Sequence, residues 1–170
     1  MRTSSETAIV RHAEPRDAAG LNEIYNHYVV TSAISFELTP TTEAERIAWL
    51  AEHPPSGPHR VVVAERRGRV IGFASSSRYR EREAYATSIE TSVYVADGST
   101  GRGIGTSLYD FLFAALVEED LHRACAGITM PNPASVALHR RFGFEHVGTF
   151  SEQGRKFGRY WDVAWFEKPL

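Results

Sequence analysis

A glycine-rich turn near the middle of the chain constrains the fold more than any other feature. It reads Thr100-Gly101-Arg102-Gly103-Ile104-Gly105 and stands between a strand-like run, 90–96, and an amphipathic run that predicts a helix. Because glycine lacks a Cβ atom, backbone N–H groups in such a turn can approach a ligand closely. The first turn of a helix adds unpaired N–H donors and the positive end of the helix dipole. Together these features predict a cradle for a pyrophosphate group.

The spacing of the glycines excludes two common phosphate-binding motifs. No Gly-Lys-Ser/Thr follows the turn, so it is not a Walker A loop. The dinucleotide fingerprint requires G-x-G-x-x-G, but Thr106 stands where the third glycine would fall. Taken alone, the turn is equally compatible with a helix entry that binds nothing. The choice depends on the residues around it.

The composition predicts one domain over residues 1–170, with residues 1–7 as a disordered N-terminal tail. Apolar residues make up 42% of the chain and charged residues 24%, which is ordinary for a globular protein. The formal net charge of −2 gives no reason to expect nucleic acid or a membrane as a partner. The single cysteine, Cys125, excludes an intrachain disulfide. With neither a signal peptide nor a membrane span visible, we expect a cytoplasmic protein without a metal cofactor.

The apolar periodicity predicts the element order β-α-α-β-β-β-α-β-α-β-β. Strands are expected over 9–12, 60–66, 69–77, 86–96, 123–129, 144–150 and 160–168. Helices are expected from Pro15 through Tyr28, from a capping box at Thr42 through Leu50, from the glycine turn through Leu116, and from Asn132 to Gly143. The helical connection between 86–96 and 123–129 implies parallel pairing of those strands. The expected fold class is therefore α/β (α+β), with a mixed, mostly antiparallel sheet and helices on both faces.

An acidic residue stands in the strand that we expect at the centre of the sheet. Glu90, Ser92 and Tyr94 share one face of it, because strand residues alternate between faces. A carboxylate there is costly unless it is solvated, paired or functional. A satisfied salt bridge is the usual structural explanation.

A second polar set follows the next strand. Asn132, Ser135 and His139 are spaced i, i+3, i+7 and so lie on one helical face, directed towards the end of the sheet that carries the glycine turn. A single helical histidine is often structural, but here it shares a face with the helix cap. The glycine turn, the strand glutamate and this face therefore converge on one end of the sheet.

On these residues the chain resembles the GCN5-related N-acetyltransferase (GNAT) superfamily. The family's loop Gln/Arg-x-x-Gly-x-Gly/Ala matches 100–105, except that Thr100 replaces Gln or Arg. Its pattern Asn-x-x-Ala-x-x-x-Tyr-x-x-x-Gly-Phe matches Asn132 to Phe144, with Ser135 for Ala and His139 for Tyr. That histidine makes the chain similar to phosphinothricin and methionine sulfoximine acetyltransferases. The similarity extends from 9 to 170, with supporting runs at 24–26, 91–95, 131–139, 148–150 and 154–163.

The resemblance implies acetyl-CoA as co-substrate and direct attack of an amine on its thioester. It implies that Glu90 is the general base, often acting through water, and that His139 donates a proton to the leaving thiolate or relays one. The backbone of 93–95 would stabilise the oxyanion and hydrogen-bond the pantetheine arm. The cofactor-binding residues that it implies are Val93, Tyr94, Val95, Gly101, Arg102, Gly103, Ile104, Gly105, Thr106, Asn132 and Ser135.

The acceptor side is expected in the run Tyr79-Arg80-Glu81-Arg82-Glu83-Ala84-Tyr85. Guanidinium groups suit the carboxylate of an amino acid, although charge content alone would favour a solvated loop. The resemblance implies a small amino-acid-like acceptor and a homodimer, and leaves open whether Lys156 and Trp161 serve the site or the dimer. The substrate-binding residues that it implies are Phe36, Arg80, Arg82, Tyr85, Thr91 and Ser92.

Three alternatives remain in view. A protein N-terminal or lysine acetyltransferase would have an open peptide groove and the family tyrosine, which His139 replaces. A non-catalytic acyl-CoA-binding module would be expected to lose the base, whereas Glu90 is present. The glycine spacing argues against a nucleotide-binding module. The physiological amine stays open.

Overall fold

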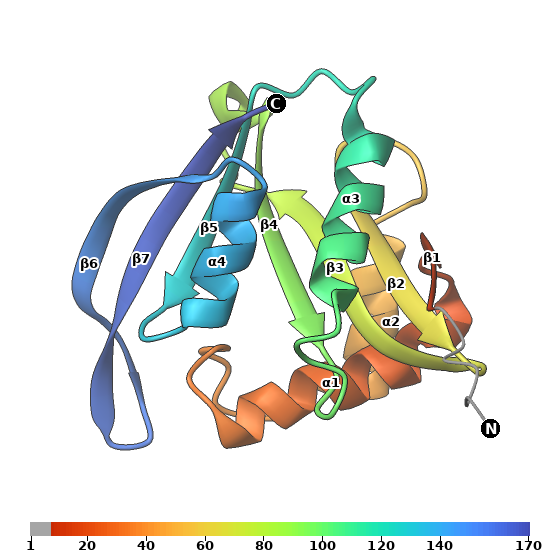
Figure 1. The fold of residues 1–170 in the computed structure, drawn as a ribbon, viewed down its shortest axis with the longest axis horizontal. Coiled ribbons are helices and arrows are strands. Elements are labelled where there is room, and N and C mark those ends of the chain that lie inside the picture. Colours follow the sequence, from red (N-terminus) through yellow and green to blue (C-terminus); the bar gives the residue numbers. More distant parts are fainter. Residues whose placement is uncertain (1–7) are drawn as a thin grey trace.

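A seven-stranded sheet forms the frame of the protein in the computed structural model, which describes residues 8–170 (Figure 1). Its strands are β1 (Ile9–His12), β2 (Arg60–Arg66), β3 (Arg69–Arg78), β4 (Ser88–Val95), β5 (Arg123–Thr129), β6 (Glu145–Lys156) and β7 (Arg159–Pro169). They lie in the order β1-β2-β3-β4-β5-β7-β6, and only β4 and β5 pair in parallel. The predicted mixed sheet and its crossover are confirmed. The tail predicted at 1–7 lies outside the described residues.

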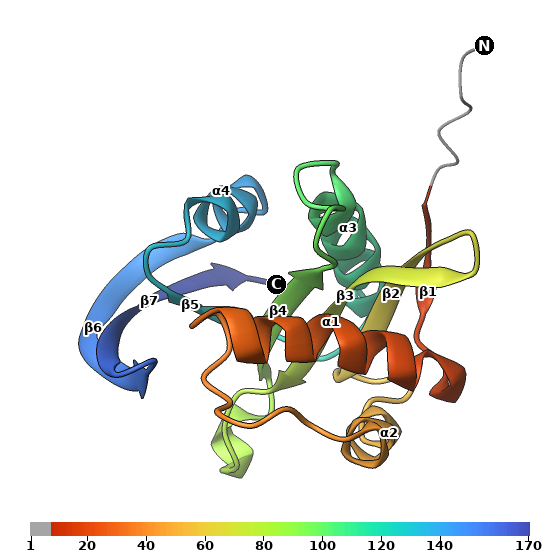
Figure 2. The same ribbon diagram turned by 90° about the horizontal axis from the view of Figure 1, so that it is seen from below.

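Helices cover both faces of this sheet, as predicted. Figure 2 shows α1 (Ala18–Thr31) and α2 (Glu43–Ala51) on one face and α3 (Ile104–Leu116) and α4 (Pro133–Arg141) on the other. Two short 3₁₀ turns, η1 (Pro15–Asp17) and η2 (Glu83–Tyr85), precede α1 and β4. Each face has its own buried apolar cluster, one around α3 and one between α1, α2 and the sheet. The sheet is therefore a wall between two packed layers.

The central strands separate part-way along their length. β4 and β5 pair only where 88–90 lies beside 123–125, and beyond Glu90 the two strands diverge (Figure 1). β4 continues in register with β3 as far as Val95. Its other edge therefore carries no partner strand in the described part of the chain. This opening connects the two faces of the sheet.

The helix ends follow the local signals in the sequence. Thr42 and Glu45 form the predicted capping box of α2. The Asn132 side chain accepts a hydrogen bond of 3.1 Å from the backbone N–H of Ser135 at the start of α4. Gly143, with φ +82°, follows the end of that helix in the left-handed conformation that glycine adopts readily. These signals are local, which is why they could be recognised without a structure.

The main departure from the predicted elements is β6, which continues to Lys156 instead of ending near 150. The strand passes an irregularity between Phe150 and Gly154 and then pairs again, with Gly154 opposite Trp161. Its second half is polar, so the apolar alternation that identifies half-buried strands is missing there. The β6–β7 hairpin consequently extends beyond the rest of the sheet.

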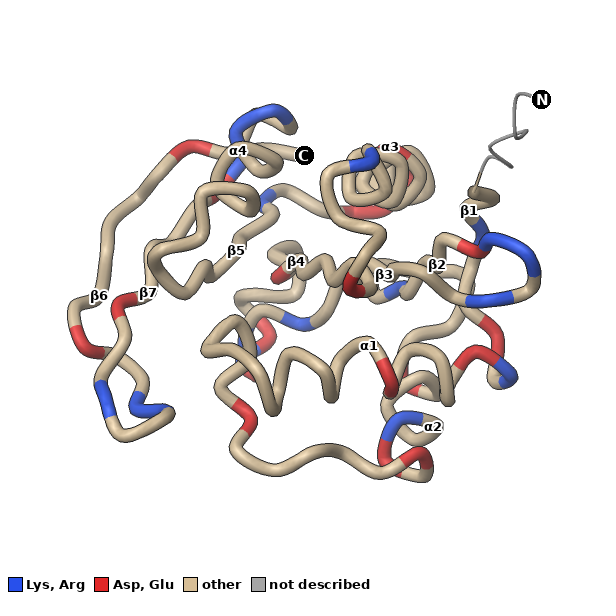
Figure 3. Tube along the Cα trace, turned by 60° about the horizontal axis from the view of Figure 1, so that its bottom comes forward, with Lys and Arg blue, Asp and Glu red and all other residues tan. Residues whose placement is uncertain are grey.

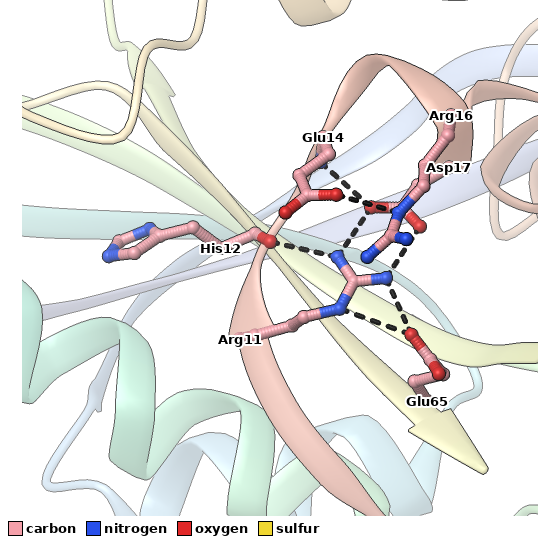
Figure 4. A network of polar contacts seen from close by, with 6 residues as sticks. All are labelled: Arg11, His12, Glu14, Arg16, Asp17 and Glu65. Carbon is pink, nitrogen blue, oxygen red and sulfur yellow. Dashed lines mark hydrogen bonds and ion pairs between the residues drawn. The ribbon is translucent and has the colours of Figure 1, made fainter. Parts of the chain in front are cut away.

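A charged network fixes the beginning of the fold. Arg11 in β1 donates hydrogen bonds to Asp17 at 2.7 and 2.8 Å and to Glu65 in β2 at 2.6 Å (Figure 4). Burial alone would raise the pKa of the Asp17 carboxyl, but the bonds from Arg11 hold it below its usual value. The network ties β1 to β2 and to the start of α1, away from the opening in the sheet.

The remaining basic residues lie mostly at the periphery. Figure 3 shows Lys and Arg gathered at the β2–β3 turn and at the tip of the β6–β7 hairpin, on opposite sides of the molecule. None of the helices within 8–170 is long and apolar enough to cross a membrane. In the same range no group of three or more His, Cys, Asp or Glu side chains is arranged to hold a metal ion.

Candidate active site

A cleft of about 700 Å³ separates the beginning of α3 from α4. Gly101 and Gly103, with φ of +71° and +78°, form its turn in a conformation that favours glycine. A Cβ at Gly105 would lie 3.0 Å from Leu138 of α4, so this glycine allows the two helices to approach. The cleft thus has the unpaired N–H groups of a helix N-terminus at one end and the free edge of β4 along one side, which fits an elongated phosphate-bearing molecule.

All but one of the predicted cofactor-binding residues line this cleft. The exception is Arg102, which faces a hollow on the other side of the turn, beside the β2–β3 turn. Sequence reasoning missed residues on the α4 wall: Ala134, Ala137, Leu138 and Arg141. Their spacing of i, i+3, i+4, i+7 was the available signal, since it marks one stripe of a helix. Tyr28 and Ile34 complete the cleft from the α1 side.

A second cavity, of about 570 Å³, lies at the opening between β4 and β5. It contains the predicted residues Phe36, Glu90, Thr91, Ser92 and His139. It also contains residues that the sequence did not identify: Tyr25, Glu37, Gly127, Gln153, Val163 and Trp165. The residues that line both spaces are Ile34, Val93, Tyr94, Asn132 and Ser135. The two spaces are therefore continuous.

Glu90 lines the cavity at the opening between β4 and β5, but not the α3–α4 cleft. Its side chain is half-buried and forms no hydrogen bond or ion pair with any residue of 8–170. Burial raises the pKa of its carboxyl, while the positive charge of Arg80 acts in the opposite direction. A raised pKa makes a carboxylate a better proton acceptor near neutral pH. The salt bridge that would have explained Glu90 structurally is not present in the described part of the chain.

His139 is held inside the protein by hydrogen bonds at both ring nitrogens. Its Nε2 lies 2.9 Å from the Tyr109 hydroxyl, and its Nδ1 lies 2.8 Å from the Ser135 carbonyl. The consistent assignment is a neutral ring that donates from Nδ1 and accepts the Tyr109 proton at Nε2. Only 3% of the residue is exposed, and burial lowers the pKa of the imidazole. Both ring nitrogens are therefore engaged, although the ring borders the cavity.

Tyr109 is a residue that sequence reasoning missed. It is fully buried in α3, where burial raises the pKa of its hydroxyl. Besides His139, the hydroxyl lies 3.4 Å from Thr91 Oγ1 in β4. One hydroxyl thus joins α3, α4 and β4 beside the point where β4 and β5 separate. The sequence pattern predicted only an amphipathic helix in this region and gave Tyr109 no role.

The loop after α1 covers the cavity and is fixed by the β6–β7 hairpin. Lys156 is buried and its Nζ donates a 2.6 Å hydrogen bond to the Ser35 carbonyl. Phe36 lies directly against Gly154, so close that a Cβ there would overlap the ring at 2.3 Å. Trp161 Nε1 in turn donates to the Lys156 carbonyl at 3.0 Å. The sequence had left the role of Lys156 open, and the structure places it under the loop that carries Phe36.

Three predicted acceptor residues lie outside the cavity. Arg80, Arg82 and Tyr85 line a separate, exposed hollow of about 620 Å³ around η2. Arg80 stacks over Tyr79 at 5.0 Å and affects Glu90 through its charge. The sequence left open whether both arginines reach the pocket that contains Glu90, and within this chain neither of them lines it. The run is polar and helix-forming at 83–85, which turns its side chains to solvent.

The family is decided by comparison with known proteins. The acetyltransferase (GNAT) domain model matches residues 10–165. This chain belongs to the GNAT acetyltransferase family. It is 56% identical over 163 residues to a phosphinothricin N-acetyltransferase of Streptomyces coelicolor, with 95% of each chain covered. The predicted similarity to phosphinothricin acetyltransferases is confirmed.

Solved structures agree with this GNAT assignment. A ribosomal-protein-alanine N-acetyltransferase from Brucella melitensis is 39% identical, with a TM-score of 0.91 and 95% and 99% of the two chains covered. A phosphinothricin acetyltransferase from Sinorhizobium meliloti in complex with acetyl-CoA is 35% identical, with a TM-score of 0.87 and 96% and 89% coverage. The chain is an acetyl-CoA-dependent N-acetyltransferase, and the cleft between α3 and α4 has the features that this co-substrate requires.

Proposed function

We propose that the protein acetylates the α-amino group of a small amino-acid-like compound of the phosphinothricin, methionine sulfoximine or methionine sulfone type. The observation that carries the proposal is the position of Glu90, an unpaired, half-buried carboxylate in a cavity continuous with the α3–α4 cleft. An amine that enters this cavity meets a base on one side and the opening of the cleft on the other. The 56% identity to a phosphinothricin N-acetyltransferase supports the substrate class.

Glu90 is the general base in this proposal. The pKa of an α-ammonium group lies above neutral, so the nucleophile is scarce until a proton is removed. The carboxylate accepts that proton directly or through one water, and the amine attacks the thioester carbonyl without an acyl-enzyme. The free edge of β4 at 93–95 offers N–H donors to the oxyanion that develops on that carbonyl.

His139 has a positioning or relay role in this scheme. Because its neutral ring donates to Ser135 and accepts from Tyr109, it supplies a proton to the leaving thiolate only if the Tyr109 proton moves to the ring in turn. A thiol ionises at about pH 8.5, so its thiolate leaves readily and little assistance is required. The imidazole and Ser135 then form part of the wall against which the thioester lies, and the buried Tyr109 hydroxyl holds the imidazole from behind.

The acceptor is limited in size by the roof over the cavity. Phe36 rests on Gly154, and Lys156 fixes the adjacent backbone, so one side is closed to an extended peptide. We further propose that Arg80 and Arg82, which line the hollow around η2 together with Tyr85, attract an anionic acceptor through their positive charges. A homodimer and a cytoplasmic location, where acetyl-CoA is available, complete the proposal.

A second candidate is acetylation of a protein N-terminus. The chain is 39% identical to a ribosomal-protein-alanine N-acetyltransferase, and this similarity supports the second candidate. An α-amino group is the nucleophile in both reactions, so Glu90 would serve either acceptor. The two acceptors differ in the group attached beyond the α-carbon, which is a free carboxylate in one and a peptide chain in the other. The closed roof at Phe36 favours the single amino acid.

The decisive experiment measures thiol release from acetyl-CoA with the purified protein. The acceptor panel contains phosphinothricin, methionine sulfoximine, methionine sulfone, the ordinary amino acids and peptides that begin with alanine. Turnover confined to the first three compounds is the expected result. Turnover confined to peptides would replace the proposal with protein acetylation. Tight acetyl-CoA binding without turnover on any acceptor would reject the substrate class.

A further inference from the structure

Arg46 in α2 is a buried cation without an anionic partner. Its exposed fraction is 6%, and its guanidinium carbon lies 4.4 Å from the ring centre of Tyr25 and 4.8 Å from that of Trp49. Among residues 8–170 it forms no ion pair, and its Nε has no hydrogen-bond partner. Its one side-chain hydrogen bond runs from a terminal nitrogen to Thr41 Oγ1 at 3.4 Å.

This arrangement has an energetic cost that the aromatic rings offset only in part. Moving a guanidinium out of water is unfavourable unless its N–H donors find acceptors, and arginine cannot escape by losing its proton. Rings on two sides hold the fork in one orientation and attract its charge, but they accept few hydrogen bonds. The side chain is therefore pre-organised with donors to spare.

The guanidinium of Arg46 lies on the acceptor side of the active site. Arg46 lines a hollow of about 370 Å³ between α2 and the sheet, whose other walls include Glu90, Ser92 and Tyr94. The last three residues also line the cavity at the opening between β4 and β5. A cation and the proposed base consequently face one continuous space.

Two other carboxylates in this hollow do not neutralise Arg46. Glu45 is engaged at the start of α2, where it accepts hydrogen bonds of 2.7 and 2.9 Å from Thr42. Glu37 is exposed on the loop after α1 and lies beyond ion-pair distance of Arg46. Glu37 is the rival explanation, because a small loop movement would bring the pair together.

We propose that Arg46 binds an anionic or strongly polarised oxo group of the acceptor, while Glu90 receives its amino group. The inference rests on the proposed function and assigns the acceptor class more narrowly: an amine that carries an oxyanion on the side facing α2. A guanidinium fork matches such groups in a bidentate manner. The oxo group is either the α-carboxylate or the phosphinate or sulfonyl group of the side chain, and the two have separate tests.

The main test compares Arg46→Gln and Arg46→Lys with the native protein on phosphinothricin and methionine sulfone. For Arg46→Gln we expect the acceptor KM to rise about ten- to a hundredfold, as when a hydrogen bond to a charged group is lost, with the Kd of acetyl-CoA unchanged. Arg46→Lys should recover part of the loss. Arg69→Gln is the matched control, since it removes one charge from a side chain that is 79% exposed and outside the hollow.

The acceptor series identifies the group that is bound. If Arg46 contacts the carboxylate, the native protein should acetylate the α-carboxamide of phosphinothricin slowly. The Arg46→Gln substitution should then lower kcat/KM for this carboxamide only slightly further. If Arg46 contacts the side-chain group, the Arg46→Gln substitution should lower kcat/KM more for phosphinothricin than for methionine sulfone, because only the phosphinate carries a full charge. Equal losses of kcat for every acceptor, with the same fall in melting temperature in the Gln and Lys variants, would overturn the inference and make Arg46 structural.

A binding measurement separates this inference from the proposed function. Trp49 stacks on Arg46, so its fluorescence should respond when phosphinothricin enters the hollow, even without turnover. A saturable response that Arg46→Gln abolishes and Glu37→Gln preserves would support Arg46 in a protein that fails the thiol-release assay. If phosphinothricin is acetylated but causes no fluorescence response, the role of Arg46 in acceptor binding is rejected and the proposed function stands.

Discussion

The two halves of the active site are built by different means. The donor half, between α3 and α4, is made largely of backbone: left-handed glycines, a helix N-terminus and the free edge of β4. The acceptor half is made of side chains from distant segments, among them Phe36, Arg46, Glu90 and Trp165. A constant co-substrate can be held by backbone geometry, which most substitutions outside the glycine turn leave unchanged. Selectivity for the acceptor resides in side chains, which can be exchanged without disturbing the donor half.

The largest effect is expected in the acceptor half, from Glu90→Gln. Loss of a general base should lower kcat near neutral pH by about 10²- to 10⁴-fold. The base works deprotonated, so native activity should fall as the pH drops through the pKa of Glu90, which burial raises. The deficit of the variant should narrow at alkaline pH, where free amine accumulates. Steady-state kinetics across about pH 6 to 9 check this.

The same variant also tests the separation of the halves. Calorimetry should give an unchanged acetyl-CoA affinity for Glu90→Gln, since the cleft is lined by other groups. A deficit that is constant with pH would exclude Glu90 as the base, and weakened acetyl-CoA binding would mean that the two halves are not independent.

The next effect belongs to the donor half. Gly103→Val should weaken acetyl-CoA binding by at least about tenfold, because a branched side chain occupies the approach to the α3 N-terminus. Gly98→Val is the matched control: both glycines have a similar positive φ, +78° and +76°, and both have open space around the added Cβ. Both variants should carry about 1–2 kcal/mol of backbone strain. Isothermal titration with acetyl-CoA should distinguish them, and equal affinities would exclude the turn at Gly103 as a pyrophosphate cradle.

A smaller effect, spread over both halves, is expected from Tyr109→Phe. The change removes the hydroxyl that joins α3, α4 and β4, and leaves His139 Nε2 buried without a donor. We expect the free energy of unfolding to fall by about 1–3 kcal/mol, together with a modest loss of kcat. Urea denaturation and kinetics measure these, with Tyr160→Phe, whose residue is 55% exposed, as the control. An unchanged free energy of unfolding would mean that the hydrogen bonds of the Tyr109 hydroxyl do not stabilise the fold.

The contrast between the halves also explains what the sequence could predict. The donor half depends on 93–106 and 132–141, two stretches with glycine spacing and a helix cap that are recognisable locally. Arg46 was missed because a charged residue in an amphipathic helix is usually solvent-exposed. Its burial depends on Tyr25 from another helix, although Trp49 at i+3 was a partial signal.

The same limit applies elsewhere in the chain. The polar second half of β6 has no alternation, and its contact with Phe36 joins residues more than a hundred positions apart. The assignment of Arg82 and Tyr85 to acceptor binding came from the resemblance, which does not encode where the η2 turn directs its side chains. Local patterns were enough to predict the elements, whereas long-range packing decided the acceptor pocket.

The smallest effect is expected in the acceptor half, in the pH–rate profiles of Arg80→Ala and Arg82→Ala. The positive charge of Arg80 favours the ionised form of Glu90, so its removal should raise the pKa of that carboxyl and move the acidic limb of the pH–rate profile to higher pH. The shift should be small, because Arg80 is solvent-exposed and salt screens its charge. Raising the salt concentration should move the native limb in the same direction. Arg82→Ala should leave the limb in place, since no such interaction links it to Glu90.

If both variants instead raise only the acceptor KM, and equally, then both arginines contact the acceptor, and the exposed hollow around η2 is part of its binding site.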